Sequence, residues 1–190
     1  MKNKKYLILL AAFALLLAGA VAAYSFLSKE YTPGSGQTKS ASDTQDTAEE
    51  ESTIPAPDFT VQDRSGETVS LSDYFGKPIV INFWATWCGP CKSELPAFDA
   101  LSKEYGEDVH FLMVNLTDGQ RETIEIVEEF LEENGYEFPV YFDTEYMASY
   151  TYGAYSIPLS VFIDKEGNVV NSHVGAMSEE TLRGYIDSIL

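Results

Sequence analysis

The short stretch Trp87-Cys88-Gly89-Pro90-Cys91 contains the only two cysteines of the 190-residue chain. It follows an apolar run over residues 79–84, which is typical of a strand buried on both faces of a sheet, and a helical pattern comes after it. A Cys-x-x-Cys pair at a strand-to-helix junction is the arrangement of a thiol–disulfide exchange site. The start of the helix places N–H groups and partial positive charge beside the first sulfur, and both stabilise the reactive thiolate.

The position of each cysteine predicts a different role for the two sulfurs. Cys88 precedes the helix and is expected to be exposed, whereas Cys91 lies one turn inside and is expected to be shielded. A thiolate at Cys88 would attack a substrate disulfide, and Cys91 would then attack Cys88 and release the reduced substrate. Gly89 and Pro90 suit the turn between them, because proline is tolerated in the first turn of a helix, where its missing N–H would be unpaired.

Two other uses of the cysteines have less support. A structural disulfide would rarely span a two-residue gap directly after a buried strand. A zinc site needs about four ligands, and the only histidines, His110 and His173, lie far from the pair in sequence and are expected on strands. We therefore expect no metal and no separate cofactor, with the Cys88–Cys91 disulfide itself as the redox-active group.

The first 27 residues are predicted to form a membrane anchor. An uncharged apolar run over residues 6–27 is long enough to span a bilayer as a helix. The lysines before this run predict that the N-terminus lies in the cytoplasm and the rest of the chain outside. The alternative is a cleaved signal peptide, for which Ala20-Val21-Ala22 offers a cleavage pattern, although the apolar run is longer than is usual for one. Both interpretations export the domain, which would be secreted if the segment is cleaved.

The remaining chain divides into a linker and one domain. Residues 28–54 are rich in Gly, Ser, Thr, Gln and acidic residues, so they bury too little apolar surface to fold. Residues 55–190 have the length and apolar content of a domain with its own core. The formal net charge of −18 argues against binding to nucleic acid or to anionic lipid.

Periodicity within the domain predicts an α/β fold. Strands are expected over residues 59–63, 68–71, 79–84, 109–115, 139–143, 160–163 and 169–174, the first two forming a β-hairpin. Helices are expected over residues 72–76, after Cys88, over 120–134 and 145–152, and after Ser178. This order predicts a central mixed sheet with helices on both faces.

The longer stretch Phe83-Trp84-Ala85-Thr86-Trp87-Cys88-Gly89-Pro90-Cys91-Lys92 resembles the active site of the thioredoxin superfamily. Three features are similar to its TlpA/ResA-like branch: the leading hairpin, the segment Cys91-Lys92-Ser93-Glu94-Leu95-Pro96, and an inserted helix–strand segment around residues 117–142. Members of this branch are membrane-tethered, extracytoplasmic thiol–disulfide oxidoreductases. The resemblance covers about residues 55–190 and implies a thioredoxin-like fold and this activity.

The resemblance also implies roles for residues outside the cysteine pair. Ile157-Pro158 matches the superfamily's cis-proline, which packs against the cysteines, and the residue before it pairs with substrate through its backbone. Together with Trp87, Gly89 and Pro90, these two residues form the expected substrate-binding surface. Glu94 is expected to handle the proton of Cys91, although a solvated helix glutamate is the alternative. Asn82 stands where classical thioredoxins have a buried acidic residue, and Leu159 departs from the threonine of many relatives, which leaves the polarity of the groove open.

The predicted function is the reduction of disulfides in exported proteins, because the Gly-Pro pair between the cysteines resembles that of reducing thioredoxins. Family roles include cytochrome c maturation. The oxidised enzyme must be re-reduced and the chain has no further cysteine, so the resemblance implies a membrane electron donor of the CcdA/DsbD type. Three alternatives are an oxidant that forms disulfides, a peroxiredoxin-like peroxidase and a redox-inactive binding module. The peroxidase pattern Pro-x-x-x-Thr-x-x-Cys is absent, and both cysteines are present where an inactive module would have lost one.

Overall fold

The computed structural model describes residues 16–17 and 54–190. The predicted membrane anchor over residues 1–27 and the linker over residues 28–54 therefore lie almost entirely outside the described residues. Within the part of the chain that is described, no helix combines the length and the apolar character needed to cross a bilayer.

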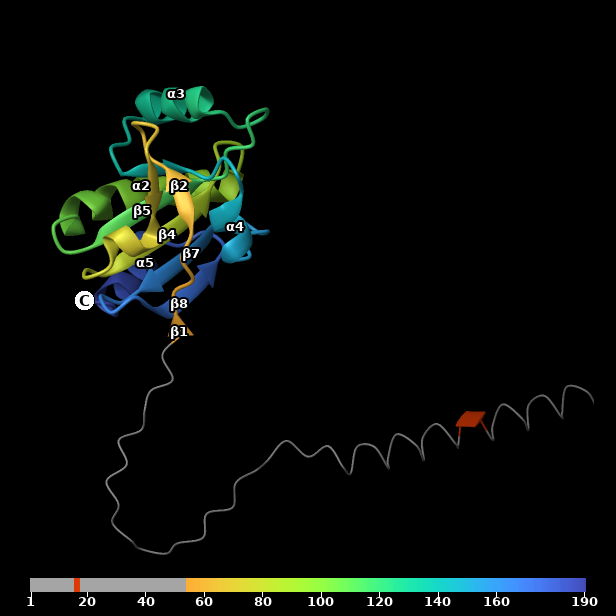
Figure 1. Ribbon diagram of the computed structural model, residues 1–190, viewed down its shortest axis with the longest axis vertical. Helices are drawn as coiled ribbons and strands as arrows, with labels where there is room; N and C mark the ends of the chain where they lie inside the picture. Colours follow the sequence, from red (N-terminus) through yellow and green to blue (C-terminus); the bar gives the residue numbers. More distant parts are fainter. Residues whose placement is uncertain (1–15, 18–53) are drawn as a thin grey trace, which may run out of the picture. The chain divides into compact units, whose positions relative to one another are not determined.

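An eight-stranded mixed sheet forms the centre of the domain (Figure 1). Its strands lie side by side in the order β1-β8-β7-β4-β5-β6-β2-β3. β4 pairs in parallel with β5, and β5 with β6, while every other pairing in the sheet is antiparallel. The strands are β1 (Ile54–Pro55), β2 (Thr60–Gln62), β3 (Thr68–Ser70), β4 (Ile79–Trp84), β5 (His110–Asn115), β6 (Val140–Phe142), β7 (Leu159–Ile163) and β8 (Asn168–Val174). The predicted mixed sheet and leading hairpin are confirmed.

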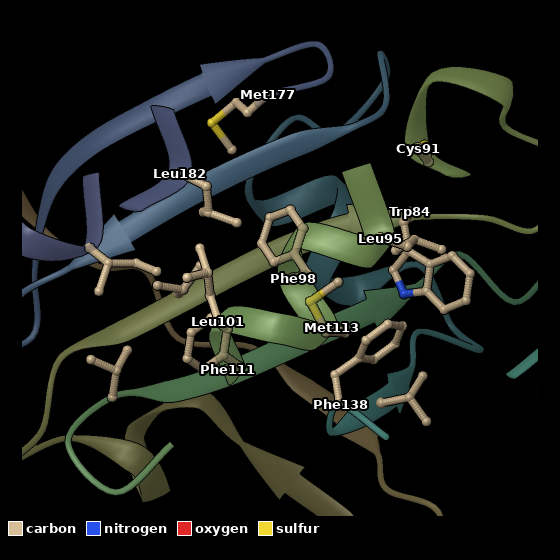
Figure 2. Close-up of a cluster of buried hydrophobic side chains, with 14 of the residues drawn as sticks. Trp84, Cys91, Leu95, Phe98, Leu101, Phe111, Met113, Phe138, Met177 and Leu182 are labelled. Carbon is tan, nitrogen blue, oxygen red and sulfur yellow. The ribbon is translucent and has the colours of Figure 1, made fainter. Parts of the chain in front are cut away.

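Helices cover both faces of this sheet, as the sequence predicts. Their bounds are η1 (Leu71–Tyr74), α2 (Gly89–Tyr105), α3 (Ile124–Asn134), α4 (Met147–Thr151) and α5 (Glu179–Asp187). One apolar cluster includes residues from α2, α3 and α5, and the other includes residues from η1 and α4. Figure 2 shows the first cluster, in which Leu95, Phe98 and Leu101 of α2 pack against the sheet.

The central strand β4 separates the two clusters. Successive side chains of a strand point to opposite faces, so Val80 and Trp84 enter the cluster beneath α2 while Ile81 and Phe83 enter the other. All six side chains of β4 are buried. Burying a large apolar side chain contributes about 1.5–3 kcal/mol to stability. The well-packed strand therefore fixes the position of residues 85–88, which follow it. The side chain of Asn82 shares the face with Val80 and Trp84 and therefore lies beneath α2.

Two predicted helices begin later than expected. The helix predicted over residues 120–134 begins at Ile124, because the Thr123 side chain accepts the N–H of Ile126 and caps it there. Residues 118–122 form a loop instead, in which one carboxylate oxygen of Asp118 accepts the N–H groups of residues 120, 121 and 122. The helix predicted over residues 145–152 is shorter, because Tyr146 adopts the left-handed conformation and α4 starts after it.

Candidate active site

Cys88 and Cys91 form a disulfide at the start of α2. Cys88 is the N-cap of the helix, and Gly89 and Pro90 occupy its first two positions. The N–H of Cys91 donates to the sulfur of Cys88 at 3.1 Å. Once the disulfide is reduced, the same N–H and the positive end of the helix dipole stabilise a thiolate at Cys88.

The expected difference in exposure between the two sulfurs is only partly present. Cys91 is fully buried, as predicted, but Cys88 is only 5% exposed. The prediction of an exposed Cys88 is therefore wrong for the disulfide form. The covering group is the loop before β7, because the carbonyl oxygen of Ile157 lies 3.8 Å from the Cys88 sulfur. Trp87 remains exposed beside the pair.

The Ile157–Pro158 peptide bond is cis, as the resemblance implies. Pro158 is buried and Ile157 is half-buried. Among the described residues, neither the N–H nor the carbonyl of Ile157 has a backbone hydrogen-bond partner. An unpaired stretch of backbone at this place can accept an extended polypeptide as an additional strand.

Glu94, three residues past Cys91 on α2, has a buried side chain, so the alternative of a solvated helix glutamate is wrong. Its Oε1 accepts the side-chain N–H of Asn82 at 2.8 Å, and its Oε2 accepts the backbone N–H of Met177 at 2.9 Å. Burial raises the pKa of Glu94 to about 7, against the opposing effect of these two hydrogen bonds. The Asn82 amide also donates to Ser160 Oγ at 3.0 Å. One turn past Cys91, the chain therefore holds a group that exchanges protons near neutral pH.

Replacing Glu94 with Gln is expected to change how stability depends on pH. Free glutamate titrates near 4.5 and folded Glu94 near 7, so the native state binds an extra proton between these values. A raised carboxyl pKa means that stability is lost as pH rises through this window, by about 3 kcal/mol in total. Urea unfolding of the disulfide form at pH 4.5 and pH 8 should show this loss in the wild type and not in Glu94→Gln. Exposed Glu132→Gln is the matched control, and equal pH dependence in all three proteins would contradict the assignment.

A second buried carboxylate, Glu122, anchors the segment just before the cysteines. Its Oε1 accepts the backbone N–H of Thr86 and the side-chain N–H of Asn115, both at 2.7 Å. Its Oε2 accepts the Thr86 hydroxyl at 2.6 Å. The neighbouring guanidinium of Arg121 lies 4.2 Å from the centre of the Trp87 ring. The loop over residues 118–122 thus holds both Thr86 and Trp87 in place.

The helix predicted over residues 120–134 includes Glu122, but this residue lies in the loop before α3 and its side chain is buried. The available signal was Thr123, a good N-cap residue directly before the apolar periodicity. Beginning the helix there would have left Glu122 in a loop. Its burial depends on contacts with Thr86 and Asn115, which the local sequence does not reveal.

Comparison with known proteins agrees with this geometry. Residues 53–172 match the AhpC/TSA family. The thioredoxin-like protein YneN of Bacillus subtilis is 35% identical over 132 residues, which cover 70% of this chain and 76% of YneN. The thiol-disulfide oxidoreductase ResA of Bacillus anthracis is 37% identical over 134 residues, which cover 70% of this chain and 76% of ResA.

Solved structures show the same fold. A putative thiol:disulfide interchange protein DsbE from Chlorobium tepidum superposes with a TM-score of 0.64 at 31% identity, covering 72% of this chain and 96% of DsbE. StoA from Bacillus subtilis superposes with a TM-score of 0.60 at 28% identity, covering 70% of this chain and 98% of StoA. With its Cys88–Cys91 disulfide at the start of α2, the chain is a thiol–disulfide oxidoreductase of thioredoxin-like fold that belongs to the AhpC/TSA family and to the TlpA/ResA-like branch of the thioredoxin superfamily.

Proposed function

We propose that this protein reduces disulfide bonds in exported proteins, outside the cytoplasm. The observation that carries the proposal is the position of the Cys88–Cys91 disulfide: Cys88 is the N-cap of α2, and its sulfur lies 3.8 Å from the carbonyl oxygen of Ile157. This arrangement brings a stabilised nucleophile and a strand-pairing edge to the same place. The Gly89-Pro90 pair between the cysteines supports reduction, because it is the pair found in reducing thioredoxins.

The proposed reaction proceeds in two exchanges. The Cys88 thiolate attacks one sulfur of the substrate disulfide, so that a mixed disulfide forms and the other substrate sulfur leaves as a thiolate. The Cys91 thiolate then attacks Cys88, which closes the Cys88–Cys91 disulfide and releases the second substrate thiol. The substrate gains two electrons and the enzyme loses them. Five residues are proposed to contact the substrate because they adjoin Cys88 in sequence or follow from its contact with the Ile157 carbonyl: Trp87, Gly89, Pro90, Ile157 and Pro158.

Glu94 is proposed to accept the proton of Cys91 before the second exchange. A pKa of about 7 suits this role, because general bases work best near the ambient pH. Asn82 and the backbone of Met177 hold the carboxyl group in place. The Glu94→Gln variant described above should also lose the inflection near pH 7 in its turnover profile, and an unchanged profile would remove Glu94 from the mechanism.

The proposed location is supported by the apolar N-terminal run, and the proposed electron donor by the family resemblance. The apolar run over residues 6–27 is proposed to anchor the domain outside the membrane, where protein disulfides persist. No cysteine other than the active pair is available to pass electrons on. A membrane dithiol donor of the CcdA/DsbD type is therefore proposed to reduce the Cys88–Cys91 disulfide after each cycle. One substrate class implied by the resemblance is the cysteine pair of apocytochrome c before haem attachment.

The reduction potential of the cysteine pair tests the direction of the reaction. A reductase of this kind should have a potential near about −270 mV, as thioredoxin does, whereas an oxidant would lie near about −120 mV. The purified full-length chain can be equilibrated with dithiothreitol or glutathione buffers and its free thiols counted by alkylation and mass spectrometry. A value close to the oxidant's would overturn the proposal and favour disulfide formation.

A further inference from the structure

An apolar pocket opens at the same edge of the sheet as the cysteine pair. It has a volume of about 370 Å³ and is lined by Leu116, Tyr146, Ser149, Tyr150, Ala154 and Tyr155. Leu116 follows β5, and its N–H donates to the carbonyl of Trp84 at 3.0 Å, so this wall lies beside the end of β4. Tyr155 precedes by two residues the Ile157 whose carbonyl contacts the Cys88 sulfur. One wall of the pocket therefore lies within two residues of the unpaired backbone of Ile157.

The rim of this pocket is unusually exposed and aromatic. Tyr150 is 75% exposed and Tyr155 is 81% exposed, the two highest values among the large apolar and aromatic side chains of the described residues. Tyr146 and Met147 are also exposed. Tyrosine offers a large amphipathic contact surface at low entropic cost, and methionine adapts its shape to different partners. Clustered exposure of this kind marks a binding surface.

Backbone geometry fixes one of these tyrosines at the pocket. Tyr146 has φ 57° and is the one non-glycine residue with positive φ in the described part of the chain. Its conformation is held by Asp143, whose carbonyl accepts the N–H of Tyr146 and whose carboxylate accepts the N–H groups of Ala148 and Ser149. Bulky residues whose backbone is held in the left-handed region are uncommon, and they tend to occur at functional sites.

Two carboxylates lie close to this pocket: Asp143 accepts the N–H of the lining residue Ser149, and Asp118 follows the lining residue Leu116 by two positions. Burial raises the pKa of the Tyr146 hydroxyl, and the nearby carboxylates of Asp118 and Asp143 raise it further. The whole chain has 30 acidic residues against 12 lysines and arginines. A ligand that carries a positive charge beside an apolar group is therefore favoured here over an acidic one.

We propose that this pocket binds an aromatic side chain of the substrate polypeptide, two or three residues from the reacting cysteine and next to a lysine or arginine. The inference deepens the proposed function, on which it rests. The spacing follows from strand geometry, because a chain paired at Ile157 with its cysteine at Cys88 advances about 3.3 Å per residue toward Tyr155. The pocket thereby selects which cysteines the enzyme reduces.

Short peptides with one cysteine, activated as the mixed disulfide with thionitrobenzoate, test this proposal. The reduced full-length enzyme in detergent attacks the peptide sulfur through Cys88, thionitrobenzoate leaves, and Cys91 then releases the peptide thiol. Stopped-flow release of thionitrobenzoate gives the second-order rate constant. Tryptophan two residues before or after the cysteine, with a neighbouring lysine, should raise this constant about tenfold or more over serine at both positions. Exchanging the lysine for glutamate should reduce the gain.

The double variant Tyr150→Ser, Tyr155→Ser should bring the tryptophan-to-serine ratio close to one. Exposed Ile126→Ser on α3 is the matched control and should keep the wild-type ratio. The inference is overturned if the wild type reacts equally with all peptides, or if the double variant keeps the preference. Failure of the proposed function itself would look different, because the enzyme would then react slowly with the serine peptides as well.

Discussion

Cys88→Ser is expected to reduce the rate of insulin-disulfide reduction to that of dithiothreitol alone. Cys88 is the sulfur that receives the N–H of Cys91 and that faces the Ile157 carbonyl, where a substrate strand would lie. A serine hydroxyl at this place does not ionise near neutral pH and cannot attack a disulfide. Cys91 cannot replace the lost nucleophile, because it is fully buried. The measurement is the turbidity of precipitating insulin chains at a fixed concentration of dithiothreitol.

Ala100→Ser provides the control for this experiment. It introduces a hydroxyl on an exposed position of the same helix, away from the disulfide, and should leave the rate unchanged. Turnover by Cys88→Ser at more than a small fraction of the wild-type rate would contradict the assignment of Cys88 as the nucleophile.

Cys91→Ser is expected to stop the cycle after the first exchange. Cys88 keeps its helix-terminus environment and still attacks, but no thiol lies within the same helical turn to resolve the product. In the wild type the two Cα atoms are 5.2 Å apart, so resolution is intramolecular and fast. The variant should release one equivalent of substrate thiol per enzyme and then remain as a mixed disulfide at Cys88, with steady turnover reduced to that of external thiols. Intact-protein mass spectrometry detects the adduct.

The reciprocal variant gives the decisive comparison for this step. Cys88→Ser should form no adduct, since its remaining cysteine is buried beneath the disulfide site. An adduct on Cys91 in that variant, or normal turnover by Cys91→Ser, would show that the roles of the two cysteines are wrongly assigned.

The parts of the fold that could be predicted are those with a local signal. The apolar run over residues 79–84 is a buried central strand because every one of its side chains meets a core. The alternating segments before it form the hairpin of β2 and β3, in which Thr60 pairs with Ser70. The cis bond at Ile157–Pro158 was predicted from the family resemblance, since composition alone would favour trans.

The parts that could not be predicted depend on contacts between distant residues. Glu94 is buried by contacts with Asn82 and with Met177, which is 83 residues away in sequence. Cys88 is covered by the loop before β7, in which Ile157 is 69 residues away in sequence. Glu122 continues the acidic pattern of the predicted helix. Asp118 and Thr123 instead hold residues 118–122 in a loop before α3, and the Glu122 side chain bonds to Thr86. The tyrosine-lined pocket likewise combines the end of β5 with the segment around α4.

The central claim, that Cys88 reduces disulfides of exported proteins, is tested most directly by a trapping measurement in the native host. Full-length Cys91→Ser can be expressed there, its thiols blocked with acid and alkylating agent, and its adducts identified by mass spectrometry of the linked peptides. The account predicts mixed disulfides that join Cys88 to cysteines of exported proteins, and none with Cys88→Ser. An absence of such adducts, or adducts confined to cytoplasmic proteins, would contradict it.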